Sequence, residues 1–291
     1  MNGAHAPAPR AAFKEFVLRM IHPFRLPVSW ACQHGIITPE VRNVLPWRWV
    51  LEPFTIYGPG WRFRWSPTEF DSIAHRMFWS GFREWERDTT PTVIEKFRRA
   101  RYFIDIGANC GIYTVMACVV NPEIRVLAIE PVSRICETLK RNVEINGFGS
   151  RVAIINAAVA DSNGIVSFHE AEDATMGSLG TTGYHGQRGR VIQVRCRTLD
   201  DVVAELGVKP DFLKIDVEGA EDVVLAGASS TLKVFRPSIV LEANPGDPAE
   251  RMTEILVSSG YSFQLLTERG PIRHNAIVPV DGNQNWLCEP I

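Results

Sequence analysis

Apolar residues along this chain follow two different patterns, and the change falls near residue 100. Beyond it, short apolar runs of strand length alternate with segments whose apolar residues recur at helical spacing. The expected strands are 102–106, 125–130, 151–159, 211–216 and 238–242. The expected helices are 111–120, the segment from Ser133 to Gly147, 199–206, 220–226 and 251–259.

The ends of two of these helices carry recognisable signals. Ser133 is expected to be the N-cap of its helix, and Gly147 to stop it. Thr198-Leu199-Asp200-Asp201 has the form of a capping box, and Gly207 is expected to end the helix that follows.

Strands that alternate with helices of this length predict right-handed crossovers and a mostly parallel sheet covered on both faces. The alternation breaks between Asp161 and Arg197, where strands at 166–168 and 191–194 flank a Gly/Thr/Ser-rich loop that is expected to border a pocket. The tail from Tyr261 onward predicts further strands with a turn at Asp281-Gly282. The fold class is therefore α/β.

Residues 1–98 are expected to form an N-terminal helical and aromatic extension, and residues 99–291 the main domain. Seven of the eight tryptophans lie in the extension, among many prolines. These aromatic residues are expected either to line an acceptor site as a lid or wall, or to form core or a dimer interface. Five arginines of the extension either hold a substrate phosphate or carboxylate or form a solvated face: Arg62, Arg64, Arg76, Arg83 and Arg87.

Composition excludes several classes of protein. The net charge of -2 gives no overall attraction for nucleic acid, and no apolar run reaches the ~18 residues of a membrane span. The six cysteines form no Cys-x-x-Cys pair, so no zinc site is predicted, and Cys118 and Cys136 are expected to be buried thiols. We expect a cytoplasmic enzyme that acts on a small-molecule or glycan acceptor; a homo-oligomer is compatible with this sequence.

The strongest chemical signal is the turn from Asp105 to Gly111, between the first strand and its helix. Gly107 permits a tight turn, Ala108 keeps the loop thin, and Gly111 lets the helix start approach the strand or a ligand. Ligands of open parallel sheets bind at this edge.

The order of residues in this turn favours S-adenosylmethionine over a dinucleotide. It lacks the Gly-x-Gly-x-x-Gly order, because Asn109 stands between its glycines, and the carboxylate of Asp105 suits a ligand with an ammonium and a sulfonium. Glu130, at the end of the second strand, can accept both ribose hydroxyls, although it would serve NAD equally well. Ala157 and Ala158 either lie beside the adenine or pack tightly within the sheet.

These segments resemble the FkbM family of class I methyltransferases. The resemblance rests on 103–114, 129–131, Asn142, Asn146-Gly147, 197–200 and 213–221, together with the aromatic–Gly–aromatic–x–Glu segment 79–84. It implies a Rossmann-like, seven-stranded class I fold, S-adenosylmethionine as cofactor with S-adenosylhomocysteine as product, and O-methylation of a sugar or polyketide-type natural product. It also implies cofactor contacts from Thr114 and Pro131.

The catalytic candidates are Asp216 and Glu218, which follow the fourth main strand and so share the edge of the cofactor turn. Either can accept the proton of an acceptor hydroxyl. With Glu221 and Glu242 they can instead contact the cofactor's amino group, cap a helix or hold a divalent metal, but no residue is assigned to a metal. His169 and His185 are weaker base candidates. The rival functions are an NAD-dependent sugar-modifying enzyme and a non-catalytic nucleoside-binding scaffold.

Overall fold

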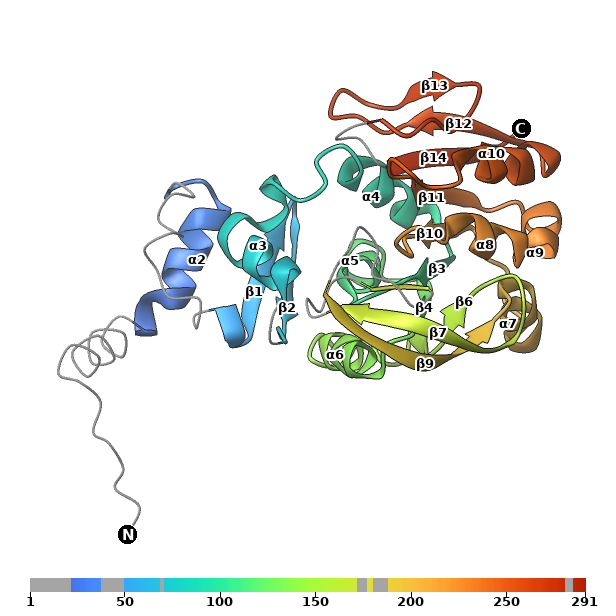
Figure 1. Cartoon of the computed structure of the whole chain (residues 1–291). Helices are drawn as coiled ribbons and strands as arrows, with labels where there is room; N and C mark the ends of the chain where they lie inside the picture. The colour runs from blue at the N-terminus through green and yellow to red at the C-terminus, as the bar shows by residue number, and fades with distance from the viewer. Residues whose placement is uncertain (1–21, 38–49, 69–70, 172–176, 180–187, 281–284) are drawn as a thin grey trace, which may run out of the picture.

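The computed structural model describes residues 22–37, 50–68, 71–171, 177–179, 188–280 and 285–291. Its centre is an eight-stranded sheet with the order β13-β12-β14-β11-β10-β3-β4-β5 (Figure 1). The strands of this sheet are β3 (Tyr102–Ile106), β4 (Arg125–Ile129), β5 (Val152–Ile155), β10 (Phe212–Ile215), β11 (Ser238–Glu242), β12 (Tyr261–Leu265), β13 (Ile272–His274) and β14 (Asn285–Pro290).

Five strands run parallel, from β5 through β4, β3 and β10 to β11, and β14, β12 and β13 continue antiparallel. This order, with β14 inserted between β11 and β12, is that of the predicted class I fold. The resemblance implies seven strands, and the short edge strand β13 adds an eighth. The turn predicted at Asp281-Gly282 lies outside the described residues.

Helices cover both faces of the sheet, as predicted, because apolar side chains of the parallel strands alternate in direction. Phe103, Val126 and Phe212 belong to the core on one face, and Ile104, Leu127 and Leu213 to the core on the other. The first core includes α4 (Thr90–Arg99), α5 (Ile112–Val120) and α6 (Ser133–Glu144). The second core includes α7 (Leu199–Leu206), α8 (Glu221–Ala226), α9 (Ser229–Val234) and α10 (Ala249–Ser258).

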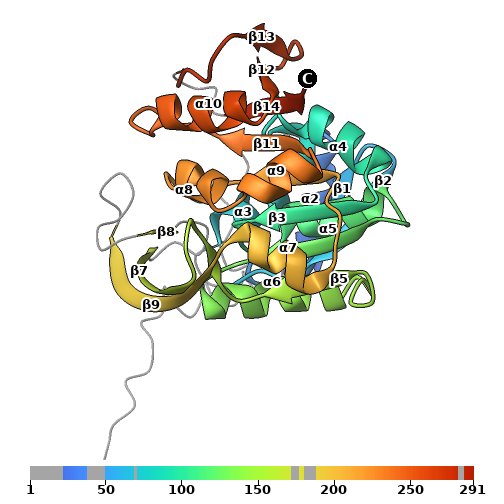
Figure 2. The same ribbon diagram turned by 90° about the vertical axis from the view of Figure 1, so that its right-hand side faces the viewer.

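The expected single strand 151–159 is wrong, because the chain changes sheet within it. Residues Val152–Ile155 form β5 of the large sheet, whereas β6 (Ala158–Val159) pairs with β9. A second sheet results, with the order β6-β9-β7-β8, and Figure 2 shows it projecting from the body of the domain. The two strands predicted within the insertion are β7 (Gly164–Ala171) and β9 (Gly189–Arg197) of this sheet, and its remaining strand is β8 (Gly177–Leu179).

The helix-end signals have different outcomes. Thr198 is an N-cap, since its Oγ1 accepts the N–H of Asp201, but the N–H of Thr198 bonds to Asn163 instead of completing a capping box. Gly207 ends α7 in a left-handed conformation. Ser133 does not cap α6: the N-cap residue is Val132, and the Ser133 hydroxyl donates to Asn156.

The part of the chain before the sheet packs beside it (Figure 1). Its aromatic side chains are mostly buried in the core that also contains α5, so core is the main role of the aromatic residues described there. Asn142 of α6 bonds to the backbone of Ser66, and Asn146, just beyond the end of α6, bonds to that of Arg64. The elements here are η1 (His22–Phe24), α2 (Arg25–Gln33), β1 (Phe54–Gly58), β2 (Trp61–Trp65), α3 (Ser72–Ser80) and η4 (Gly81–Arg83).

The cysteines and the helices bear on two further expectations. All six cysteines are buried and free, including Cys118 and Cys136. None of the helices in the described ranges has both the length and the apolar character needed to cross a bilayer.

Candidate functional site

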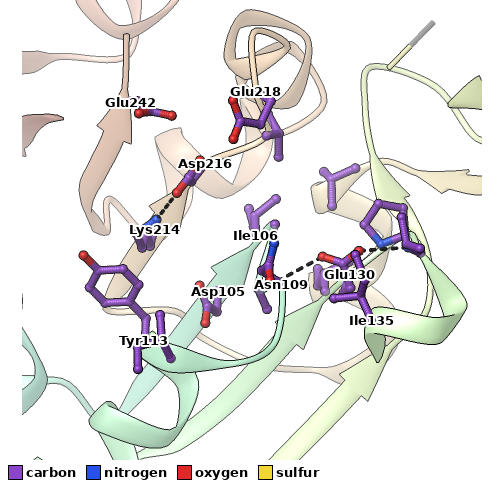
Figure 3. A pocket seen from close by; sticks show the side chains of 18 of the residues that line it. Asp105, Ile106, Asn109, Tyr113, Glu130, Ile135, Lys214, Asp216, Glu218 and Glu242 are labelled. Atoms are coloured by element: carbon purple, nitrogen blue, oxygen red, sulfur yellow. Dashed lines mark hydrogen bonds and ion pairs between the residues drawn. The ribbon is translucent and has the colours of Figure 1, made fainter. Parts of the chain in front are cut away.

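A cavity of about 350 Å³ opens at the carboxyl ends of β3, β4, β10 and β11. The chain leaves β3 toward β4 and β5 on one side and returns through β10 and β11 on the other. Loops therefore diverge between β3 and β10, and such a divergence opens a crevice for ligands. Figure 3 shows residues from all four strand ends around this space.

The predicted turn after β3 forms one wall of the cavity. The N–H groups of Gly107 and Ala108 both donate to the carbonyl of Ile129 at 3.0 Å, which ties the turn to the end of β4. Gly107 has φ +75°, and a Cβ built on it would lie 1.8 Å from the carbonyl oxygen of Asp216. Only glycine fits there, because both the backbone conformation and the close approach exclude a side chain.

Glu130 stands beside this turn as a buried carboxylate with two backbone donors. Its oxygens accept the N–H of Asn109 at 3.0 Å and the N–H of Val132 at 2.8 Å (Figure 3). Burial raises the pKa of Glu130 to about 7, against the effect of these two hydrogen bonds. Each oxygen keeps a lone pair for a ligand hydroxyl, as a ribose site requires.

Asp105 lines the cavity from the end of β3 and is 1% exposed. It accepts a hydrogen bond of 2.6 Å from the hydroxyl of Thr114. Burial raises its pKa to about 6, although Lys214 lowers it. Thr114 itself does not line the cavity, so it acts on Asp105 and not on the space beyond it.

The remaining residues predicted for the cofactor divide into lining and supporting positions. Ala108, Asn109, Pro131, Ala157 and Ala158 line the cavity, together with the apolar side chains of Ile135, Phe168 and Leu179. Gly111 does not line it: with φ +91°, it brings the start of α5 against Leu139, and a Cβ there would lie 2.4 Å from that side chain. The cations of the described lining are Arg76 and Lys214, and Lys214 is bonded to Asp216, so these residues form no cluster of cations for a pyrophosphate.

Asp216 and Glu218 lie at the opposite end of the cavity, with Glu242 at the end of β11 (Figure 3). One carboxylate oxygen from each of the three lies within 4.8 Å of the others, an arrangement that can also hold a cation. Asp216 is bonded to the ammonium of Lys214 at 2.6 Å. The acids predicted from the strand ends therefore meet in space.

The pKa values of these three acids are shifted in different directions. Burial and the charge of Asp216 raise the pKa of Glu218 to about 8 and that of Glu242 to about 10. Burial also opposes ionisation of Asp216, but Lys214 outweighs it and lowers the pKa of Asp216. Burial alone would lower the pKa of Lys214, yet the carboxylates of Asp216, Glu86 and Asp105 raise it. Asp216 is thus the stable anion of the cluster.

Three residues of the site were missed by the sequence analysis. Lys214 is buried in β10, with its Nζ 4.5 Å from the ring centre of Tyr113. The Tyr113 hydroxyl donates to Glu86, which belongs to the segment between η4 and α4. A lysine within an otherwise apolar strand, Phe212-Leu213-Lys214-Ile215, was the one available signal, because a buried charge requires a partner.

Strained backbone is concentrated at this cavity. Among the described residues, the non-glycine residues with positive φ are Glu86, Asn109, Glu218 and Arg236. The first three line the cavity, at φ +34°, +51° and +57°. Such conformations cost about 1–3 kcal/mol each and persist where the surrounding structure enforces them, as at binding sites.

The weaker candidates lie elsewhere. Glu221 does not line the cavity: its carboxylate accepts the N–H of Val217, so it stabilises the turn before α8. His169 is buried in β7 outside the cavity lining, and His185 lies outside the described residues. Of the five arginines, only Arg76 lines the cavity.

Comparison with known proteins identifies the domain. The methyltransferase FkbM domain matches residues 105–263, which begin at Asp105 and include Glu130, Asp216 and Glu218. The chain is 25% identical over 232 residues to the AMB antimetabolite synthetase AmbE of Pseudomonas aeruginosa, covering 65% of this chain and 11% of AmbE. It is 28% identical over 196 residues to the 31-O-demethyl-FK506 methyltransferase FkbM of Streptomyces tacrolimicus, covering 58% of this chain and 74% of the relative.

A third relative is the 2-O-methyltransferase NoeI of Sinorhizobium fredii, 29% identical over 147 residues that cover 46% of this chain and 59% of NoeI. The domain match covers more than half of the 291 residues. With the strand order, it confirms the class I fold and, at the level of the family, the predicted enzyme class and cofactor. The chain therefore belongs to the FkbM family of methyltransferases.

Proposed function

We propose that this chain transfers a methyl group from S-adenosylmethionine to a hydroxyl of a sugar or a polyketide-type natural product. One observation carries the proposal: a single cavity joins a nucleoside end, at Glu130, to an acidic end, at Asp216 and Glu218. A methyltransferase needs these two ends at one crevice, because the acceptor must meet the donor methyl in line.

The nucleoside end supplies groups for each part of the cofactor. Glu130 is assigned to the ribose hydroxyls, and the apolar wall of Ile135, Ala157 and Ala158 to the adenine. Asp105, on the side toward Lys214, is assigned to the ammonium of the methionine portion. S-adenosylmethionine, when bound, supplies an electrophilic methyl on a positively charged sulfur. A phosphate-free, cationic ligand matches this lining of carboxylates and apolar groups.

The acidic end is assigned to the acceptor hydroxyl. Glu218 takes the hydroxyl proton, since its pKa of about 8 makes it the strongest base that is still ionised in part near neutral pH. Asp216 remains an anion beside Lys214 and orients the acceptor by accepting hydrogen bonds. The carbon–sulfur bond breaks as the oxygen–carbon bond forms, and the proton passes to the carboxylate.

The named activities of the relatives support an oxygen acceptor. NoeI is named as a 2-O-methyltransferase and FkbM as a 31-O-demethyl-FK506 methyltransferase, which agrees with the acceptor hydroxyl that the family resemblance implies. At these identities the names support oxygen as the acceptor atom.

Two experiments test the proposal in sequence. Calorimetry should detect binding of S-adenosylhomocysteine and no binding of NAD. Binding of NAD without binding of S-adenosylhomocysteine would favour the NAD-dependent alternative. A screen of sugars, glycosides and demethylated polyketides with labelled S-adenosylmethionine should then give a product heavier by one CH₂ unit. A protein that binds the cofactor but gives no product with any acceptor in the screen would favour a non-catalytic scaffold. Its cofactor binding should then be the same in Glu218→Gln.

A further inference from the structure

Two side chains of the N-terminal part bring hydrogen-bond donors to an otherwise acidic cavity. Arg76 of α3 and Trp85, which precedes α4, both line it. The guanidinium carbon of Arg76 lies 5.5 Å from the ring centre of Trp85. An arginine that stacks on an indole keeps the N–H groups of its edge available for a planar anion.

The donor of Trp85 is poorly satisfied within the protein. Trp85 is 9% exposed, and its Nε1–H, beside the hydroxyl of Tyr113, has no acceptor at good hydrogen-bond geometry in the described part of the chain. A buried donor left unpaired costs roughly 1–3 kcal/mol, so such a group at a cavity wall favours a ligand that supplies an acceptor. Arg76 has no ion pair or hydrogen bond to a described residue, and it is exposed at the cavity.

The other arginines of the N-terminal part do not compete for this role. Arg83 donates to the carbonyl of Cys32, and Arg87 pairs with Glu268. Arg62 and Arg64 lie on β2 and do not line the cavity. Lys214 does line it, but its ammonium is bonded to Asp216. Arg76 is therefore the cation of the described lining that a ligand can engage.

The acids of the cavity lining have partners other than Arg76. Asp216 is bonded to Lys214, and Glu86 accepts the hydroxyl of Tyr113. Asp105 accepts the hydroxyl of Thr114, and Glu130 accepts two backbone N–H groups. The guanidinium edge of Arg76 therefore stays available to a ligand.

We propose that Arg76 and Trp85 form an anion subsite, and that the acceptor carries a carboxylate or phosphate group in addition to the hydroxyl that is methylated. This inference rests on the proposed function, because it describes the acceptor of that reaction. Arg76 contributes a planar pair of donors, and Trp85 adds one N–H. Both residues precede the matched domain, so the N-terminal part determines which acceptors are selected.

The test uses pairs of probes in which one member carries an anionic group that the other lacks, added to protein saturated with S-adenosylhomocysteine. Methyl glucuronoside is compared with methyl glucoside, 4-hydroxybenzoate with 4-hydroxybenzyl alcohol, and glucose 6-phosphate with glucose, by ligand-observed NMR titration. The charged member should bind at least about tenfold more tightly, the factor expected from one charge-assisted hydrogen bond. The carboxylate and phosphate pairs distinguish the two sources of the anion.

Matched variants locate the effect. Arg76→Gln should abolish the preference for the charged member, and Trp85→Phe, which keeps the ring but removes the N–H, should reduce it. Arg87→Gln should leave it unchanged. Equal affinities in every pair, including no detectable binding, overturn the subsite. If the wild-type protein does not bind S-adenosylhomocysteine, the proposed function is overturned instead. The two failures are therefore distinguishable.

Discussion

The carboxylate of Glu130 accepts the backbone N–H of Asn109 at 3.0 Å and so joins the ends of two neighbouring strands. The bond fixes a turn in which Asn109 has φ +51°, a conformation that this residue type tolerates better than most. Under the proposed function Glu130 therefore has two roles that mutation can separate: one set of lone pairs supports the turn, and the other set is assigned to a ribose.

Glu130→Gln tests the ribose assignment. The amide keeps one acceptor oxygen for the backbone but loses the charge that strengthens hydrogen bonds to hydroxyls. We expect binding of S-adenosylhomocysteine, measured by calorimetry, to weaken by roughly tenfold to several hundredfold, since a hydrogen bond to a charged group contributes ~1.5–3 kcal/mol. Glu137→Gln, on the exposed face of α6 where Glu137 pairs with Lys140, is the control. Equal affinities of the two variants would remove Glu130 from the site.

Gly107→Ala tests the contact between the turn and the strand end after β10. The new Cβ would lie 1.8 Å from the carbonyl oxygen of Asp216, so either the turn or that strand end must move. We expect cofactor binding to be lost and the melting temperature to fall. Gly147→Ala is the matched control, because Gly147 has φ +73° but nothing within 4 Å of its added Cβ. A similar loss in both variants would attribute the effect to backbone conformation alone.

Glu242→Gln tests the pH dependence of stability. Because its pKa is raised from 4.5 to about 10, chiefly by burial, the folded protein retains a proton that the unfolded chain releases. The stabilisation is complete below the unfolded value and is lost as the pH rises toward the folded value.

We therefore expect the wild-type melting temperature to fall between about pH 5 and about pH 9, and Glu242→Gln to fall less. At about pH 8.5 the variant should be more stable by roughly 2–4 °C, the shift produced by ~1 kcal/mol in a domain of this size class. Glu254→Gln, at an exposed position of α10, should follow the wild-type curve. A steeper fall for Glu242→Gln would contradict the sign.

Glu218→Gln tests the assignment of the base. The ionised fraction of Glu218 increases as the pH approaches about 8, so kcat/KM for an acceptor found by the screen should rise up to that pH and then level off. The variant should lose this rise and be slower by about 10²–10⁴-fold. Retention of the same profile by Glu218→Gln would assign the titration to another group.

Metal removal tests the alternative use of the acidic cluster. The ammonium of Lys214 already neutralises Asp216, and the raised pKa of Glu242 keeps that carboxyl protonated, so the cluster offers few free charges to a divalent cation. Methyl transfer should stay within about twofold after treatment with EDTA. A loss that Mg²⁺ restores would make the cluster a metal site.

The sequence was sufficient to predict the residues that follow the strands of the parallel sheet. The proximity of Asp105, Glu130 and Asp216 could be predicted from the sequence, because the carboxyl ends of parallel strands share one edge. By contrast, Glu86 reaches Tyr113 from 27 positions earlier in the chain. Nothing in its local pattern specifies that contact, which depends on how the N-terminal part packs against α5.

The error at 151–159 has a similar origin. Apolar runs predict that a strand exists, but hydrogen bonding to a neighbour decides which sheet it joins. The run contains Asn156, whose side chain donates to the carbonyls of Glu130 and Pro131, and the chain changes sheet there. A side chain bonded to the backbone across 26 positions gives no periodic signal.

Because β6 pairs with β9, the second sheet forms part of the cavity wall that is assigned to the adenine. Ala158 belongs to β6, and Phe168 and Leu179 reach the same cavity from β7 and β8. Under the proposed function, grafting this insertion from one family member into another would therefore change affinity for the methyl donor as well as the choice of acceptor. The same dependence constrains the evolution of this segment, because an altered insertion must still close one side of the proposed adenine site.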